Sequence, residues 1–116
     1  MGLNLKELGK KVADGMAGPA YVNVVFKFKV GLAEKYILKD PMKVRADGND
    51  VAVVNPESSA TVQLKEGSHL VRLWMGSSGE KGVVDSTINL TKGSNYEVTY
   101  EYSITGNSGK ISVRTI

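Results

Sequence analysis

The 116-residue chain contains no cysteine and a single histidine, His69. The absence of cysteine excludes disulfide bonds, thiol nucleophiles, iron–sulfur clusters and cysteine-ligated zinc. One histidine is also a poor start for a zinc site, which would then have to be completed by carboxylates. Because disulfide-free proteins are typical of a reducing compartment, we expect a cytoplasmic location.

Long apolar runs and blocks of like charge are also missing. No window approaches about 18 consecutive apolar residues, so no membrane insertion is predicted. Lys6, Lys10 and Lys11 interrupt the leucines of the first twelve residues, which argues against a signal peptide. The fifteen basic and twelve acidic side chains are interspersed and give a net charge of +3. Because nucleic-acid-binding domains gather basic residues on one patch, we expect no nucleic-acid partner.

Glycine, by contrast, is plentiful at thirteen residues, which indicates many tight turns. Between the turns, apolar and polar side chains alternate. From Ala20 to Val30 every even-numbered residue is apolar, and from Tyr96 to Ile104 the apolar side chains again share one parity. A period of two residues is typical of a strand with one side against an apolar core.

Shorter patterns predict further strands. Segments 42–46 and 51–54 flank a turn signal at 47–50 and predict a hairpin. Segments 62–70 and 88–96 resemble one another, each with a leucine, a glycine three residues later and a new apolar stretch. They predict two more hairpins with the same turn chemistry. Because turns recur about every ten residues, we expect an all-β antiparallel β-sandwich of about seven strands, immunoglobulin-like or prealbumin-like.

A short amphipathic helix is predicted before the strands, over residues 3–15. Leu5, Leu8 and Val12 follow the spacing i, i+3, i+7, which places them on one face. This face could pack on the domain, cover a sheet edge or bind a protein partner, including a second copy of the chain.

Three segments come close to functional motifs without completing them. The stretch 105–112 resembles a phosphate-binding loop, but only two residues separate its glycines and a strand-like segment follows its lysine. The stretch 76–79 lacks the last glycine of a nucleophile elbow, because Glu80 occupies that position. The acidic turn 47–50 lacks the distal glutamate of a calcium loop. We therefore expect no enzyme, and no catalytic, cofactor-binding or metal-binding residue.

Other residues are candidates for a ligand-binding or interaction surface. Trp74 and Tyr21 are the aromatic residues that we expect to be exposed, and an exposed ring could stack on the apolar face of a sugar. His69 should be a polar residue beside a turn, since Asn95 occupies the matching place in the second of the two similar segments. The candidate surface consists of Trp74, Tyr21 and His69, with Leu5, Leu8 and Val12 of the helix.

Three stretches between Lys43 and Tyr102 follow a recurring pattern. Val44–Gly48 has the form V-x-x-D-G, and Val62–Val71 has the form V-x-L-x-x-G-x-H-x-V, which Leu90–Val98 repeats in part. In these features the chain resembles the PEGA and carboxypeptidase-regulatory-like β-sandwich modules. The proline that this family usually carries between the leucine and the glycine is absent. The resemblance implies a non-catalytic accessory module with a sandwich fold, often attached to other domains.

The sequence therefore predicts a helix and linker over residues 1–18 and a β-sandwich domain over 19–116. The predicted function is a non-catalytic accessory or protein-interaction module that binds its partner through the helix or a sheet edge. The alternative is a carbohydrate-binding module that uses the exposed aromatic rings.

Overall fold

The computed structural model describes residues 20–31, 38–76, 79–104 and 106–116. The predicted N-terminal helix, with Leu5, Leu8 and Val12, lies outside these residues. The described parts of the chain form eight strands and no helix. The strands are β1 (Tyr21–Lys29), β2 (Met42–Ala46), β3 (Asn49–Val54), β4 (Ser59–Lys65), β5 (Gly67–Met75), β6 (Lys81–Leu90), β7 (Tyr96–Ser103) and β8 (Ser108–Thr115).

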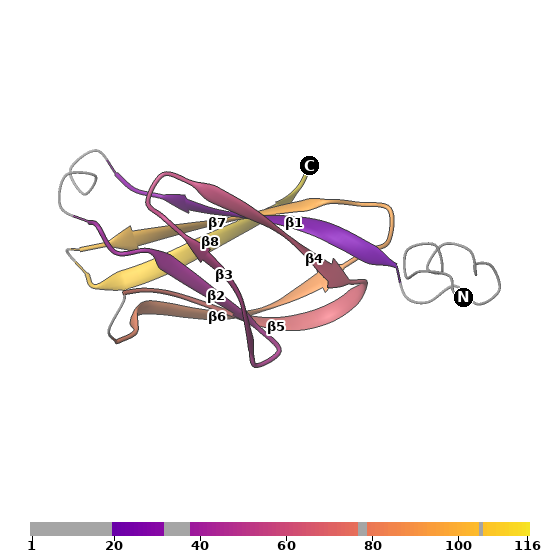
Figure 1. The fold of residues 1–116 in the computed structure, drawn as a ribbon, viewed down its shortest axis with the longest axis horizontal. Helices are drawn as coiled ribbons and strands as arrows, with labels where there is room; N and C mark the ends of the chain where they lie inside the picture. The colour runs from indigo at the N-terminus through magenta and orange to yellow at the C-terminus, as the bar shows by residue number, and fades with distance from the viewer. Residues whose placement is uncertain (1–19, 32–37, 77–78, 105) are drawn as a thin grey trace, which may run out of the picture.

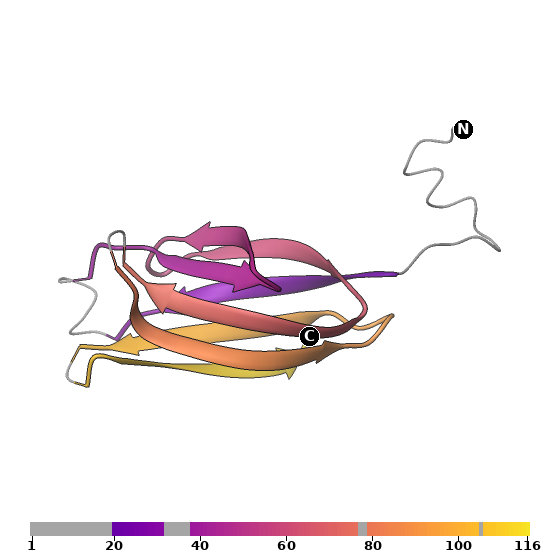
Figure 2. The same cartoon turned by 90° about the horizontal axis from the view of Figure 1, so that it is seen from below.

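The strands form two four-stranded sheets that lie against each other as layers (Figures 1 and 2), which confirms the predicted all-β, sandwich-like architecture. Sheet A has the order β4-β1-β7-β8, and sheet B has the order β3-β2-β5-β6. Neighbouring strands are antiparallel except β1 and β7, which run parallel. The first strand therefore lies inside sheet A, between two strands that follow it much later in the chain.

The two long alternating stretches are strands with their apolar side against the core, as predicted. In β1, Phe26 and Phe28 are buried while Lys27 and Lys29 are exposed. In β7 the apolar residues from Val98 onward are buried. Ile104, the last residue of the second pattern, lies beyond the strand and is 40% exposed.

The core fills the space between the two sheets, and every buried side chain among the described residues is apolar or aromatic. Phe28 and Tyr100 pack with their ring centroids 5.6 Å apart and their planes tilted by 56°, an arrangement that aromatic pairs favour. The buried residues of sheet A are Val22, Val24, Phe26, Phe28, Val98, Tyr100 and Tyr102, and those of the sheet B core are Met42, Val44, Ala46, Val54, Val71, Leu73, Met75, Ile88 and Leu90.

The predicted hairpin around Asp47 and Gly48 is confirmed. β2 and β3 pair directly, and both turn residues have positive φ, 50° and 85°, which is the backbone of a two-residue hairpin turn whose twist matches that of the strands. β3 begins at Asn49, earlier than predicted, and the register shifts between Val44 and Arg45.

The two hairpins predicted over residues 62–70 and 88–96 are wrong. The turns are present, and Gly67 and Gly93 have φ of 118° and 88°, as their turn chemistry requires. However, β4 belongs to sheet A and β5 to sheet B, and β6 and β7 are divided in the same way. Both turns therefore carry the chain from one sheet to the other. Turn residues determine where the chain reverses, whereas the partner of each strand is decided by pairings between distant segments.

The edges of the two sheets come together where β6 faces β8. Tyr100 on β7 donates a hydrogen bond from its hydroxyl to the carbonyl of Gly82 on β6, at 2.7 Å. Burial, and to a smaller extent the neighbouring Tyr102, raises the pKa of Tyr100. Gly109 on β8 lies so close that a Cβ atom there would overlap the carbonyl of Gly82 and the ring of Tyr100. Glycine is needed here because the two edges approach at backbone distance.

Candidate functional site

Trp74 lies on the outer face of sheet B. Its neighbours Leu73 and Met75 on β5 point into the core, and Trp74 points away from it. The residue is nevertheless only 5% exposed. The expectation of an exposed Trp74 is therefore wrong, because a two-residue period fixes the side of the strand and does not show what covers that side. A ring this well covered is not an open platform for a sugar.

Arg45 on β2 packs over the Trp74 ring. Its guanidinium carbon lies 4.9 Å from the ring centroid, a distance typical of a cation–π contact. The Nε of Arg45 also donates to Oδ1 of Asp50 on β3, at 2.9 Å. The guanidinium is thus held by the ring below it and by a carboxylate beside it.

Exposed apolar side chains lie around this pair. Val53, Leu70 and Val83 are 63%, 59% and 40% exposed. The strand register places Val53 opposite Lys43, and Lys43 in turn opposite Trp74, on the same outer face. Leu70 shares this side of β5 with Trp74. We call the outer surface formed by Val53, Leu70, Trp74, Val83, Arg45 and Arg72 the Trp74 face.

The charges of the Trp74 face neutralise one another. Arg72 donates to both carboxylate oxygens of Asp85, from Nε at 2.8 Å and from Nη2 at 3.1 Å, and its Nη1 contacts Glu80 at 3.3 Å. The hydrogen bond from Arg72 lowers the pKa of Asp85. Together with Arg45 and Asp50, this leaves both arginines paired with acids. The face therefore presents apolar side chains among ion pairs that are already complete.

The outer face of sheet A has a different character, since rows of charge run across β1, β7 and β8. In the first row, Lys27 and Arg114 both contact Glu97, at N–O distances of 3.4 and 2.6 Å. The second row consists of Lys29, Glu101 and Lys110, at N–O distances of 3.6 and 3.5 Å. Each carboxylate is shared by two cations, so these rows carry a positive excess.

His69 connects three segments at one end of the sandwich. Its Nδ1 lies 2.6 Å from Oδ2 of Asp47, and its Nε2 lies 2.6 Å from the carbonyl oxygen of Lys65. Asp47 also accepts a hydrogen bond from the backbone N–H of Leu70 at 2.9 Å. A carbonyl and an ionised carboxylate can only accept, so both ring nitrogens of His69 carry a proton in this arrangement. His69 lies beside a turn, and its polar atoms are fully used in joining β4, β5 and the β2–β3 turn.

The charged form of His69 is favoured despite its burial. Burial by itself lowers the pKa, but the hydrogen bonds to the Lys65 carbonyl and the Asp47 carboxylate outweigh it and raise the pKa above the usual value of 6.5. For Asp47, the hydrogen bond from the Leu70 N–H and then that from His69 lower the pKa. The two shifts have the directions expected for an ion pair.

Tyr21 is exposed, as predicted, at 59%. It lies at the start of β1 on the outer face of sheet A, opposite Lys65 of β4. Tyr21 and Trp74 are therefore on the outer faces of different sheets, and they do not form a single aromatic platform.

The incomplete functional motifs that the sequence analysis singled out lie at connections between strands. Gly79 and Glu80 lead into β6, and Gly106 and Asn107 lead into β8, so a strand rather than a helix follows each. Within the described residues, no group of three or more histidine and acidic side chains could hold a metal ion. In the same residues, no helix has the length and apolar character needed to span a membrane.

The sequence reasoning missed most of the Trp74 face. A signal was present in the valine pairs Val53–Val54 and Val83–Val84. Two successive apolar residues in a strand place one of them on the solvent side. Arg45 carried no such signal, because its contact with Trp74 depends on the pairing of β2 with β5. No protein-family model and no curated protein matches the chain.

Proposed function

We propose that the domain is a non-catalytic interaction module, and that its Trp74 face packs against the same face of a second copy. The observation that carries this proposal is that three exposed aliphatic side chains gather around Arg45 and Trp74. The other exposed large apolar residues of the described chain are Tyr21 at the start of β1, Val113 on the edge strand β8, and Ile104 and Ile116 beyond the strands. Val53, Leu70 and Val83 lie on the outer face of sheet B. The outer face of sheet A instead carries shared ion pairs.

The composition of the Trp74 face supports an interface. Arginine is enriched among the residues that contribute most to protein–protein binding, and Arg45 and Arg72 are partly exposed here. Trp74 is covered and acts beneath Arg45 as its support. Arg45 is already ordered by Trp74 and Asp50, so binding would cost little of its side-chain entropy. The exposed valines and Leu70 would supply apolar area around it.

Charge favours a second copy as the occupant. In a two-fold symmetric interface each face meets an identical face, so an unbalanced charge would repel itself. Both arginines of the Trp74 face are paired with acids, Arg45 with Asp50 and Arg72 with Glu80 and Asp85. Lys43 lies beside them on the same outer face. The rows of shared ion pairs, with their positive excess, lie on the outer face of sheet A, where they would not oppose the contact.

We also propose that the sandwich is of the prealbumin-like type. Immunoglobulin constant domains divide seven strands as ABED and CFG, with strands two and three in different sheets. Here β2 and β3 pair directly, and β1 lies between β4 and β7. This order favours the prealbumin-like alternative, and it is in keeping with the resemblance to PEGA and carboxypeptidase-regulatory-like modules as non-catalytic accessory domains.

The test is the mass of the protein in solution. Sedimentation equilibrium from about 1 μM to about 1 mM covers the range of weak and moderate complexes. We expect a monomer–dimer equilibrium for the wild type and a monomer for the variant with Val53→Glu and Val83→Glu, because a carboxylate in the interface would lose its water without gaining a partner.

The matched control is the variant with Ser59→Glu and Thr61→Glu, at exposed positions of β4 on the outer face of sheet A. It introduces the same charge on the other side of the sandwich and should leave the dimer intact. A wild-type protein that is monomeric throughout, or a control that dissociates as fully as the variant with Val53→Glu and Val83→Glu, would show that the Trp74 face is not this interface. Circular dichroism confirms that each variant is folded.

A further inference from the structure

Three amide residues are linked through Asn23, which lies two residues after Tyr21 on the same exposed side of β1. Nε2 of Gln63 donates to Oδ1 of Asn23 at 3.2 Å, and the backbone N–H of Asn23 donates to Oδ1 of Asn95 at 3.4 Å. The three residues come from β4, from β1 and from the connection between β6 and β7. Asn23 and Tyr21 lie on the same side of β1. We call Tyr21, Asn23, Gln63 and Asn95 the Tyr21 cluster.

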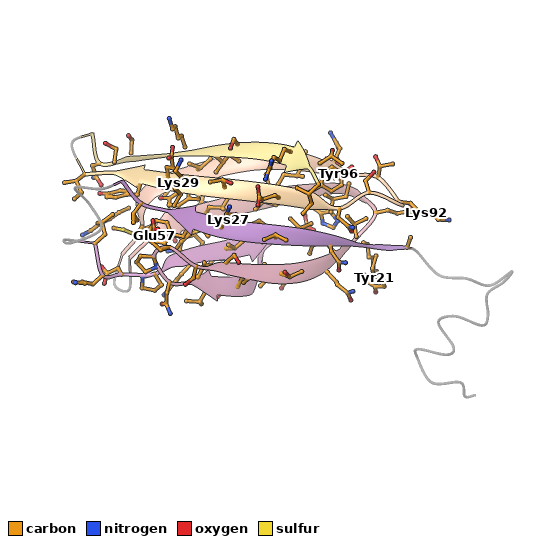
Figure 3. All side chains as sticks on the ribbon, turned by 90° about the horizontal axis from the view of Figure 1, so that it is seen from above. Tyr21, Lys27, Lys29, Glu57, Lys92 and Tyr96 are labelled. Carbon is orange, nitrogen blue, oxygen red and sulfur yellow. The ribbon has the colours of Figure 1, made fainter. Side chains whose placement is uncertain are left out.

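We propose that the Tyr21 cluster is a saccharide-binding site, in which the tyrosine ring stacks on a pyranose and the amides bind its hydroxyl groups. Tyr21 is 59% exposed, so its ring is available. One face of a pyranose carries axial C–H groups, which are apolar and slightly positive. They match the negative face of an aromatic ring. Figure 3 shows Tyr21 at the end of β1 that lies away from Lys27 and Lys29.

The amides offer the polar groups that sugar hydroxyls need. A hydroxyl both donates and accepts, and a primary amide also offers both functions. The contacts within the cluster use Oδ1 of Asn23, Nε2 of Gln63 and Oδ1 of Asn95. Among the described residues, the NH2 groups of Asn23 and Asn95 and the Oε1 of Gln63 have no hydrogen-bond partner and remain for a ligand. Because the contacts within the cluster already orient these groups, less ordering is needed on binding.

The charge of the cluster favours a saccharide over a single-stranded nucleic acid, which can also stack on tyrosine. Tight binding of a polyanion depends on several cations along its path. Lys65, opposite Tyr21 in the register, supplies one cation beside the three neutral amides. The nearest row of charge already pairs Lys27 and Arg114 with Glu97.

The site is independent of the Trp74 face, since the two lie on the outer faces of different sheets. Failure of the dimer experiment would therefore leave the Tyr21 cluster untouched, and loss of sugar binding would say nothing about dimer formation.

The test is binding of the fluorescently labelled full chain to a glycan array that includes neutral and acidic oligosaccharides, followed by titration of the strongest ligand. We expect Tyr21→Ala to weaken binding about tenfold or more, which is about 1.4 kcal/mol, because the substitution removes both the stacking contact and the apolar area that the ring would bury. Asn23→Ala should also weaken it, and Tyr21→Phe should retain it. The control Asn49→Ala removes an exposed amide from β3 and should bind as the wild type does.

Three results would overturn the proposal. The first is an array on which the wild type binds no glycan above the level of Tyr21→Ala. The second is glycan binding that is equal in the wild type and in both Tyr21→Ala and Asn23→Ala. The third is tighter binding to a labelled poly-dT oligonucleotide than to any glycan. All substituted residues are exposed, so the variants should remain folded, which circular dichroism checks.

Discussion

At the scale of single residues, His69 shows how much structure one protonated side chain can organise. Its two N–H groups join the carboxylate of Asp47 to the carbonyl of Lys65, which belong to different sheets. Neutral histidine has one N–H and one lone pair, so it can satisfy one of these acceptors only. Loss of the proton therefore removes one of the two links.

This arrangement predicts how stability depends on pH. Folding raises the pKa of His69 above 6.5, so its contribution is fully present below about 6.5 and is lost as the pH rises through the folded-state value. Folding lowers the pKa of Asp47 from 3.8, so its contribution is present above that value and is lost on acidification through the folded-state value. The free energy of unfolding contributed by the pair should be greatest between these limits, which urea titrations across the pH range will measure.

The variant His69→Gln isolates the contribution of His69 to the pH dependence of stability. It keeps one amide donor but has no titrating group. We expect a loss on the order of 1 kcal/mol at pH 5, a smaller loss above neutrality, and a flatter pH profile between them. NMR titration of the His69 ring in the folded protein provides the direct check, and a measured pKa at or below 6.5 would contradict this account.

The sequence predicted which side of a strand a residue faces better than it predicted which residues it contacts. The alternating pattern correctly predicted that Phe26 and Phe28 are buried and that Lys27 is exposed. Successive side chains of a strand point to opposite faces of the sheet, so one face can be read from every second residue. The environment of Trp74 depends on which strands lie beside β5, and sequence order does not give that. The partners of His69 could not be found for the same reason, since Asp47 comes from a turn more than twenty residues earlier.

At the scale of elements, the sequence correctly predicted where the chain turns, but it did not predict which strands pair across those turns. Gly67 and Gly93 do mark chain reversals. The direct β2–β3 pairing followed from a two-residue turn with a defined twist. The connections from β4 to β5 and from β6 to β7 cross between the sheets instead, although only Glu66 separates β4 from β5. Their course is decided by the apolar inner faces that the whole sandwich must bury.

The approach of β6 to β8 leads to a prediction about Gly109. In Gly109→Ala the added methyl group would meet the Gly82 carbonyl and the Tyr100 ring. Relieving this overlap requires the two sheet edges to separate. We expect the free energy of unfolding to fall by about 1–3 kcal/mol, as for other overpacked sites. Chemical denaturation measures this change.

Ser112→Ala serves as the comparison, because it lies on the exposed side of the same strand. Its effect should stay within about 0.5 kcal/mol. Equal stabilities for the two variants would mean that β8 can move away from β6 without cost.

At the scale of the whole molecule, the order of pairing predicts slow folding. β1 pairs with β7, so that Val24 lies beside Tyr96 and sheet A joins segments from both ends of the described chain. Closing so long a loop costs entropy before the contacts repay it. We expect folding in roughly milliseconds to seconds rather than microseconds. Stopped-flow Trp74 fluorescence after dilution from urea will measure the rate, and a microsecond phase that accounts for the full signal would contradict the expectation.

The parallel β1–β7 pair also determines how the domain would respond to tension. Ala20 and Ile116 lie at the same end of the sandwich, held by hydrogen bonds to Glu66 and Asn95. A force pulling these two residues apart would meet β8 as an edge strand joined to β7 alone within its sheet. The hydrogen bonds between β7 and β8 would break one after another, starting at the pair Tyr96–Thr115, instead of all being loaded at once. The domain would therefore yield at low force and lose β8 while the pairing of β1 with β4 and β7 was still intact.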